Sequence, residues 1–216
     1  MVALDNSALI GRAPRIRHLP PAALIAVAAM VIVLGCQALR GFGENGFRLG
    51  SENAWRFTFF VFFAALMAGP VKRLFTRFVP ALERLDSSQL IWGFCASYGV
   101  FLASLLVQPV MSLTPGLAMF VLLSAMVIVV MALSLLKAAA RVLGERARQA
   151  LLGVAAIYFW LCYSSIALAH ISGPHRPDIF YNLSVSLMVV ALLVRYADHF
   201  VRHMRARPDS VSIAPQ

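Results

Sequence analysis

Six long stretches of nearly uninterrupted apolar residues alternate along the chain with short polar connections. A helix that crosses a bilayer needs roughly 20 apolar residues, and each stretch comes close to that length. The expected spans are, in chain order, about 22–39, 54–70, 89–107, 117–136, 150–171 and 179–196. The pattern therefore predicts an all-α fold, a polytopic membrane helix bundle of about six transmembrane helices.

The polar connections carry turn and cap signals. The segment 40–53 holds four glycines and two glutamates, so we predict an exposed loop there. Pro70 is expected to end the second span, and residues 72–86 are expected to form a short amphipathic surface helix. Ser87 or Ser88 is the expected N-cap of the third span, because a serine hydroxyl can accept a hydrogen bond from a backbone N–H of the first turn.

Composition excludes a soluble fold. Hydrophobic residues make up 61% of the chain, charged residues 13%, and the mean hydropathy is +0.80, whereas soluble domains are roughly half apolar. Six spans leave little chain for a soluble catalytic domain. The three cysteines, Cys36, Cys95 and Cys162, each fall within an apolar stretch, and we interpret them as packing residues.

The basic residues set the expected orientation. The N-terminal arm holds three of the 19 lysines and arginines, and the connection 72–86, the segment 137–148 and the C-terminal stretch from Arg195 onward hold four each, which leaves four for the other side. Because basic segments are retained in the cytoplasm, both termini are expected there. The chain then divides into a cytoplasmic arm (1–20), a single six-helix domain (21–197) and a basic cytoplasmic tail (198–216).

The net charge of +10 has two candidate partners. The bases lie in short clusters between apolar stretches and form no continuous face, so no nucleic acid is expected. Anionic lipid headgroups suit clusters placed at the membrane surface.

A cleaved first span is the alternative topology. Basic residues, an apolar stretch and the sequence VLGC at 33–36 resemble a lipoprotein signal with its acceptor cysteine. Cleavage there would leave five spans and place the N-terminus outside, against the charge distribution.

Candidate chemistry is sparse. All nine acidic residues lie in arms, connections or the last turn of a helix, which disfavours a proton-coupled carrier. His170 and His175, near the outer end of the fifth span, could hold a metal or haem, or be interfacial polar groups. His199 and His203 are one helical turn apart and could bind a divalent metal or face anionic lipid, but neighbouring arginines oppose a metal, so no metal site is predicted. No catalytic motif is present, so catalytic residues are not assigned.

Three stretches, GSENAWRF at 50–57, GPVKRL at 69–74 and LGER at 143–146, give the chain a family resemblance. Over about 46–196 it resembles the ferric-reductase-like transmembrane domain, and particularly the small haem-binding membrane subunit of the bacterial methionine sulfoxide reductase system. The resemblance implies a bundle in the bacterial inner membrane that carries electrons through b-type haem, held by histidines on paired helices. Neutral imidazole suits this role because it donates a lone pair without adding charge.

The sequence departs from that family at the residues that would hold haem. The expected histidines fall near Phe101 or Leu102 in the third span and near Leu151 and Ser164 in the fifth. None of these side chains can replace imidazole as an axial ligand. The resemblance therefore implies a relative without haem, although haem b stays an alternative.

Three functions remain open at this stage. The first is a haem-free scaffold or partner subunit of another membrane or redox complex. The second is an electron-transfer subunit that binds haem b or a quinone through His170 and His175. The third is a small-solute transporter or channel with Gln37, Gln108 and the serines of the spans along its path.

Overall fold

The computed structural model describes residues 20–76, 78–79, 86–107, 115–172 and 178–205, and within these ranges the chain forms six helices and no strand. Each helix is long and apolar enough to cross a membrane, which confirms the predicted bundle of six spans. The helices are α1 (Pro21–Arg40), α2 (Glu44–Phe75), α3 (Ser87–Leu106), α4 (Pro115–Leu135), α5 (Lys137–Ile171) and α6 (Ile179–Arg205).

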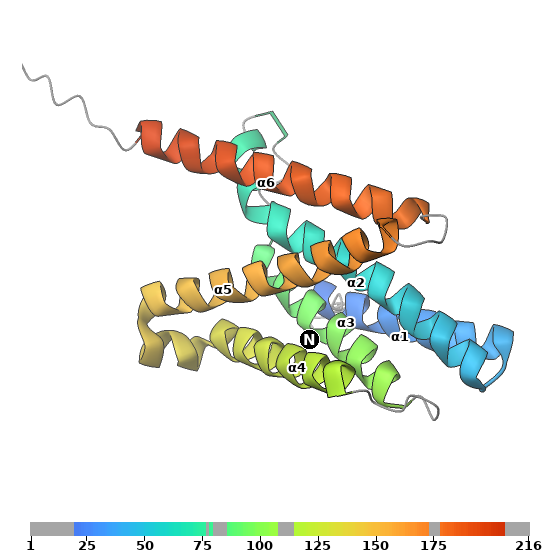
Figure 1. Cartoon of the computed structure of the whole chain (residues 1–216). Helices are drawn as coiled ribbons and strands as arrows, with labels where there is room; N and C mark the ends of the chain where they lie inside the picture. The colour runs from blue at the N-terminus through green and yellow to red at the C-terminus, as the bar shows by residue number, and fades with distance from the viewer. Residues whose placement is uncertain (1–19, 77, 80–85, 108–114, 173–177, 206–216) are drawn as a thin grey trace, which may run out of the picture.

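Helix α2 lies at the centre of the bundle and packs against α1, α3 and α6 (Figure 1). Helix α3 also packs against α1 and α4, and α5 packs against α4 and α6. Helices α2, α4 and α6 finish, and α3 and α5 begin, at the same end of the bundle. We call this the basic end. Helices α5 and α6 diverge toward it, at the left of Figure 1.

Helix α2 begins ten residues earlier than the sequence suggested. The predicted loop 40–53 is wrong from Glu44 onward, because the connection between α1 and α2 is short and includes Gly41 at φ 86°. Gly46 and Gly50 are buried and face α1: a Cβ at Gly50 would lie 3.2 Å from the carbonyl oxygen of Val33. The glycines are there for close helix contact, as small residues are in many membrane bundles.

Replacing Gly46 by alanine is expected to destabilise the fold by about 1–2 kcal/mol. A Cβ at this position would overlap the backbone carbonyl of Gly41 and lie 3.3 Å from the Cα of Gln37, so α1 and α2 must separate. Thermal unfolding in detergent measures the effect. Gly35→Ala is the matched control, because a Cβ there meets nothing within 4 Å, and an equal loss in both variants would contradict the close contact.

Three other boundaries differ from the predictions. Pro70 lies inside α2, which runs on to Phe75 and so takes in the start of the expected surface helix. The basic segment before the fifth span is helical and is joined to it at Gly144, whose φ of 74° marks a kink. Helix α6 continues to Arg205, so the first residues of the expected tail are helical.

The N-cap of α3 is Asp86 and neither of the predicted serines. Its carboxylate accepts hydrogen bonds from the backbone N–H of Ser88 at 2.9 Å and from the Ser88 hydroxyl at 2.8 Å. The side-chain bond from Ser88 lowers the pKa of Asp86 below its ordinary value. The serine therefore contributes to the cap as a donor.

Replacing Asp86 by alanine is expected to cost about 1 kcal/mol of stability, whereas asparagine should retain the cap. Because the pKa of Asp86 is lowered by folding, its stabilisation is present above the ordinary aspartate pKa and is lost as pH falls through the lowered value. Unfolding measured from about pH 6 to about pH 2 should show the wild type losing this advantage over the alanine variant. A constant difference at all pH values would contradict a carboxylate cap.

Candidate functional site

The space between α2, α3 and α5 is filled by eight buried aromatic side chains, which we call the aromatic core. Their spacing is i, i+4 and i+7 in α2 and in α3, and i and i+4 in α5. Residues at this spacing lie on one face of a helix. The aromatic core consists of Trp55, Phe59, Phe62, Phe94, Tyr98, Phe101, Phe159 and Tyr163.

These rings join α5 to the two central helices. The ring centroids of Trp55 and Tyr163 are 4.2 Å apart, and Phe159 lies 4.9 Å from both Phe94 and Tyr98. Such tilted and edge-on arrangements are the favoured ones for aromatic pairs. In the described part of the chain, side-chain rings and not close backbone approach hold α5 against α2 and α3.

The hydroxyl groups in this region form hydrogen bonds inside the bundle. Tyr163 donates to the Thr58 hydroxyl at 2.9 Å, and Thr58 donates to the backbone carbonyl of Trp55 at 2.8 Å. The hydroxyl of Ser124 on α4 lies 2.8 Å from that of Tyr158 on α5. Polar groups that lie away from water are stabilised in this way.

One of the positions at which the family resemblance implies a haem ligand, near Phe101 or Leu102, lies within this packing. Phe101 is part of the aromatic core, and Leu102 beside it is buried. Leu151 and Ser164 are half-buried on α5, and the Ser164 hydroxyl oxygen is buried without a hydrogen-bond partner among the described residues.

The candidate ligand His170 lies at the exposed end of α5, outside the aromatic core. Its ring stacks on Tyr181 at 4.1 Å between centroids, and its Nδ1 lies 2.8 Å from the carbonyl oxygen of Ile166. His175 lies outside the described residues, so the structure does not test the predicted pair. Within the described ranges, no group of three or more His, Cys, Asp or Glu could hold a metal ion.

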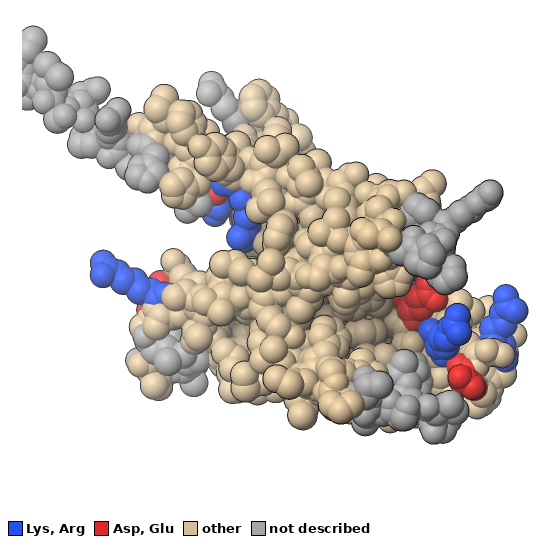
Figure 2. Space-filling view, viewed as in Figure 1, with Lys and Arg blue, Asp and Glu red and all other residues tan. Residues whose placement is uncertain are grey.

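An ion cluster near His170 ties α2 to the start of α6. Arg56 donates to Glu52 at 2.5 Å and to Asp178 at 2.6 Å, and its guanidinium lies 5.3 Å from the ring centre of Phe180. This cluster lies at the opposite end from the basic end, where red and blue atoms meet at the right of Figure 2. The cluster holds α2 and the start of α6 together, and both of its carboxylates accept hydrogen bonds from the one arginine, Arg56.

A cleft of about 620 Å³ opens at the basic end, and helices α2 to α6 all contribute to its walls. Figure 2 shows it as a hollow between α5 and α6 with basic side chains on its inner wall. Its polar side chains include Arg73, Gln149, Arg195, Asp198 and His199. We call this hollow the basic-end cleft.

A two-bond ion pair forms part of the cleft wall. Arg73 donates from Nε and Nη2 to the two carboxylate oxygens of Asp198 at 2.9 and 2.7 Å. The Asp198 side chain is only 4% exposed, whereas that of Arg73 is 49% exposed. This pairing of planar groups fixes the end of α6 against α2.

Sequence reasoning placed Asp198 and His199 in a solvated tail, and the structure places both on α6 beside the cleft. His203 lies on the same helix, with a side chain outside the described set. The one available signal in the sequence was Asp198, an acidic residue among bases within a helical pattern. Its partner Arg73 lies 125 residues earlier and could not be identified from spacing.

Comparison with protein families, characterised proteins and solved structures gives no match for this chain.

Proposed function

We propose that the protein is a haem-free membrane subunit of the ferric-reductase-like type that serves as a scaffold for another membrane or redox subunit. The aromatic core carries this proposal. Rings from α2, α3 and α5 pack together and include Phe101, at one of the positions where the resemblance implies a haem ligand; Phe94, Tyr98 and Phe159 are 0% exposed. Packing of this kind stabilises a fixed arrangement of helices.

The charges at the two ends support an inner-membrane orientation with both termini in the cytoplasm. At the end opposite the basic end, three arginines are balanced by three carboxylates in the described ranges: Arg40, Arg48, Arg56, Glu44, Glu52 and Asp178. The basic end carries the excess of positive charge, including Lys72, Arg146 and Arg195. Cytoplasmic retention of basic segments supports this direction.

Gene deletion followed by quantitative membrane proteomics tests the scaffold role. At least one membrane protein should fall in abundance at unchanged transcript level, recover on complementation, and co-purify with the tagged chain in fixed proportion. Purification of the chain alone as a unit that reduces quinone, or that moves solute in proteoliposomes, would contradict the scaffold.

A further inference from the structure

A small apolar pocket of about 110 Å³ continues from the basic-end cleft between α5 and α6. The two hollows share Leu66, Ala156 and Arg195. Ile157 and Leu192 line the pocket and are 61% and 49% exposed, so its outer side faces the surroundings of the bundle. In a membrane, those surroundings are acyl chains.

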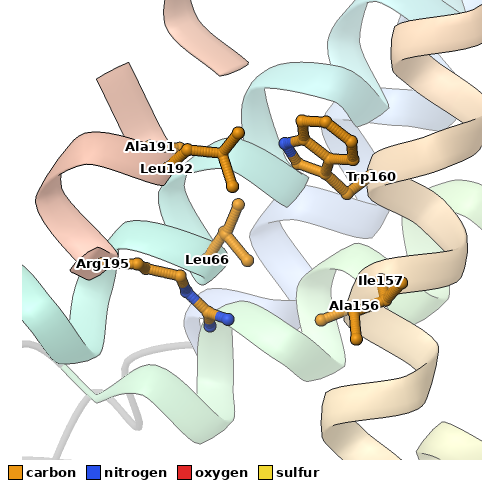
Figure 3. Close-up of a pocket in the computed structure, with 7 residues that line it drawn as sticks. All are labelled: Leu66, Ala156, Ile157, Trp160, Ala191, Leu192 and Arg195. Atoms are coloured by element: carbon orange, nitrogen blue, oxygen red, sulfur yellow. The ribbon is translucent and has the colours of Figure 1, made fainter. Parts of the chain in front are cut away.

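Two hydrogen-bond donors belong to this otherwise apolar pocket. Figure 3 shows the Arg195 side chain reaching from α6 toward α5, and the indole nitrogen of Trp160 on the side of its ring that faces α6. The Trp160 Nε1 atom is buried and has no hydrogen-bond partner among the described residues. An indole N–H of this kind usually donates to an acceptor when it is buried.

The two donors lie at different depths. Trp160 follows Ala156 by one helical turn, which is a rise of about 6 Å, and Ala156 lies with Arg195 in both hollows. Helix α5 runs away from the basic end, so Trp160 lies deeper in the bundle than Arg195. A ligand that satisfies both has an anionic group near the surface and a neutral acceptor about one turn below it.

We propose that this pocket binds an anionic phospholipid of the surrounding leaflet. The phosphate lies at Arg195, an ester carbonyl accepts from Trp160 Nε1, and the start of one acyl chain lies over Leu66 and between Ile157 and Leu192. Guanidinium groups bind phosphate through several parallel hydrogen bonds. The site is independent of the scaffold role.

The charges of the cleft favour an anion. Arg73 neutralises the nearby carboxylate of Asp198 by two hydrogen bonds. With the two arginines Arg73 and Arg195 against the one carboxylate of Asp198, the described wall carries net positive charge. Free phosphate would use the charge but not the apolar surface, so the lipid accounts for both.

Native mass spectrometry of the full-length protein in detergent tests the site, with phosphatidylglycerol and phosphatidylcholine of identical acyl chains as probes. The expected affinity for phosphatidylglycerol is roughly tenfold higher, and Arg195→Gln should remove most of that preference. Trp160→Phe should weaken both lipids by roughly threefold, because both carry the ester carbonyl. Arg148→Gln is the matched control, since Arg148 pairs with Glu145 and lies outside both hollows.

Several results would overturn the site. These are equal affinity for the two lipids, equal loss in the Arg148 control, or unchanged binding in the Trp160 variant. Displacement of phosphatidylglycerol by soluble glycerol phosphate would show that only the anion is recognised. Thermal unfolding of each variant identifies any that fails to fold, and Trp160→Phe, which keeps an aromatic ring, then carries the test alone.

Discussion

Replacement of Arg73 by methionine is expected to lower the free energy of unfolding by about 3 kcal/mol. The substitution removes the guanidinium from which both oxygens of the nearly buried Asp198 carboxylate accept hydrogen bonds. A carboxylate that loses its cation in a low-dielectric site keeps the cost of desolvation without the attraction. Denaturant titration in detergent micelles, followed by tryptophan fluorescence, measures the change.

The double variant Arg73→Met with Asp198→Leu separates the loss of the ion pair from the cost of leaving the buried Asp198 carboxylate without its cation. It should recover most of the stability, because an apolar pair can replace a buried ion pair at little cost. The Arg148→Met variant is the surface control: its partner Glu145 is 56% exposed, so about 0.5 kcal/mol is expected. Equal losses for Arg73 and Arg148 would show that the Asp198 pair has no special role.

Replacement of Phe159 by alanine is expected to cost about 3–4 kcal/mol. Phe159 is fully buried and contacts Phe62, Phe94 and Tyr98, so its removal leaves a cavity at the point where α5 meets α2 and α3. The same titration measures the loss.

Phe60→Ala is the matched control for this substitution. Phe60 lies on α2 but is 43% exposed, and an exposed ring in a membrane already has apolar surroundings, so a loss of about 1 kcal/mol or less is expected. If Phe159 and Phe60 cost the same, the aromatic core would not be the element that holds α5 in place.

The six spans could be predicted because the length and polarity of a spanning helix follow from the bilayer alone. The start of α2 could not, because Gly46 and Gly50 have the same composition in an exposed loop as in a close helix contact. Only the position of α1 distinguishes the two cases, and that position depends on tertiary packing. The N-cap of α3 was misplaced by one residue for a related reason, since aspartate and serine are both good caps.

The candidate sites were less predictable than the spans. The i, i+4, i+7 spacing of aromatic residues in α2 and in α3 was present in the sequence. It indicates that the residues of each helix lie on one face, but not which helix lies opposite that face. The basic-end cleft depends on Arg73, Asp198 and Arg195, which come from two helices far apart in the chain. From the local sequence alone, such charges are placed at membrane surfaces. Only the fold shows that these three side chains lie at one cleft.

The haem content of the purified protein tests the central claim most directly. The chain is produced with an ample haem supply, purified in mild detergent and reduced with dithionite, and its haem is quantified against protein from the b-type absorption bands. The aromatic core predicts no b-type bands and haem far below one per chain. One haem per chain, lost on substitution of His170 but not of a surface histidine such as His199, would contradict it.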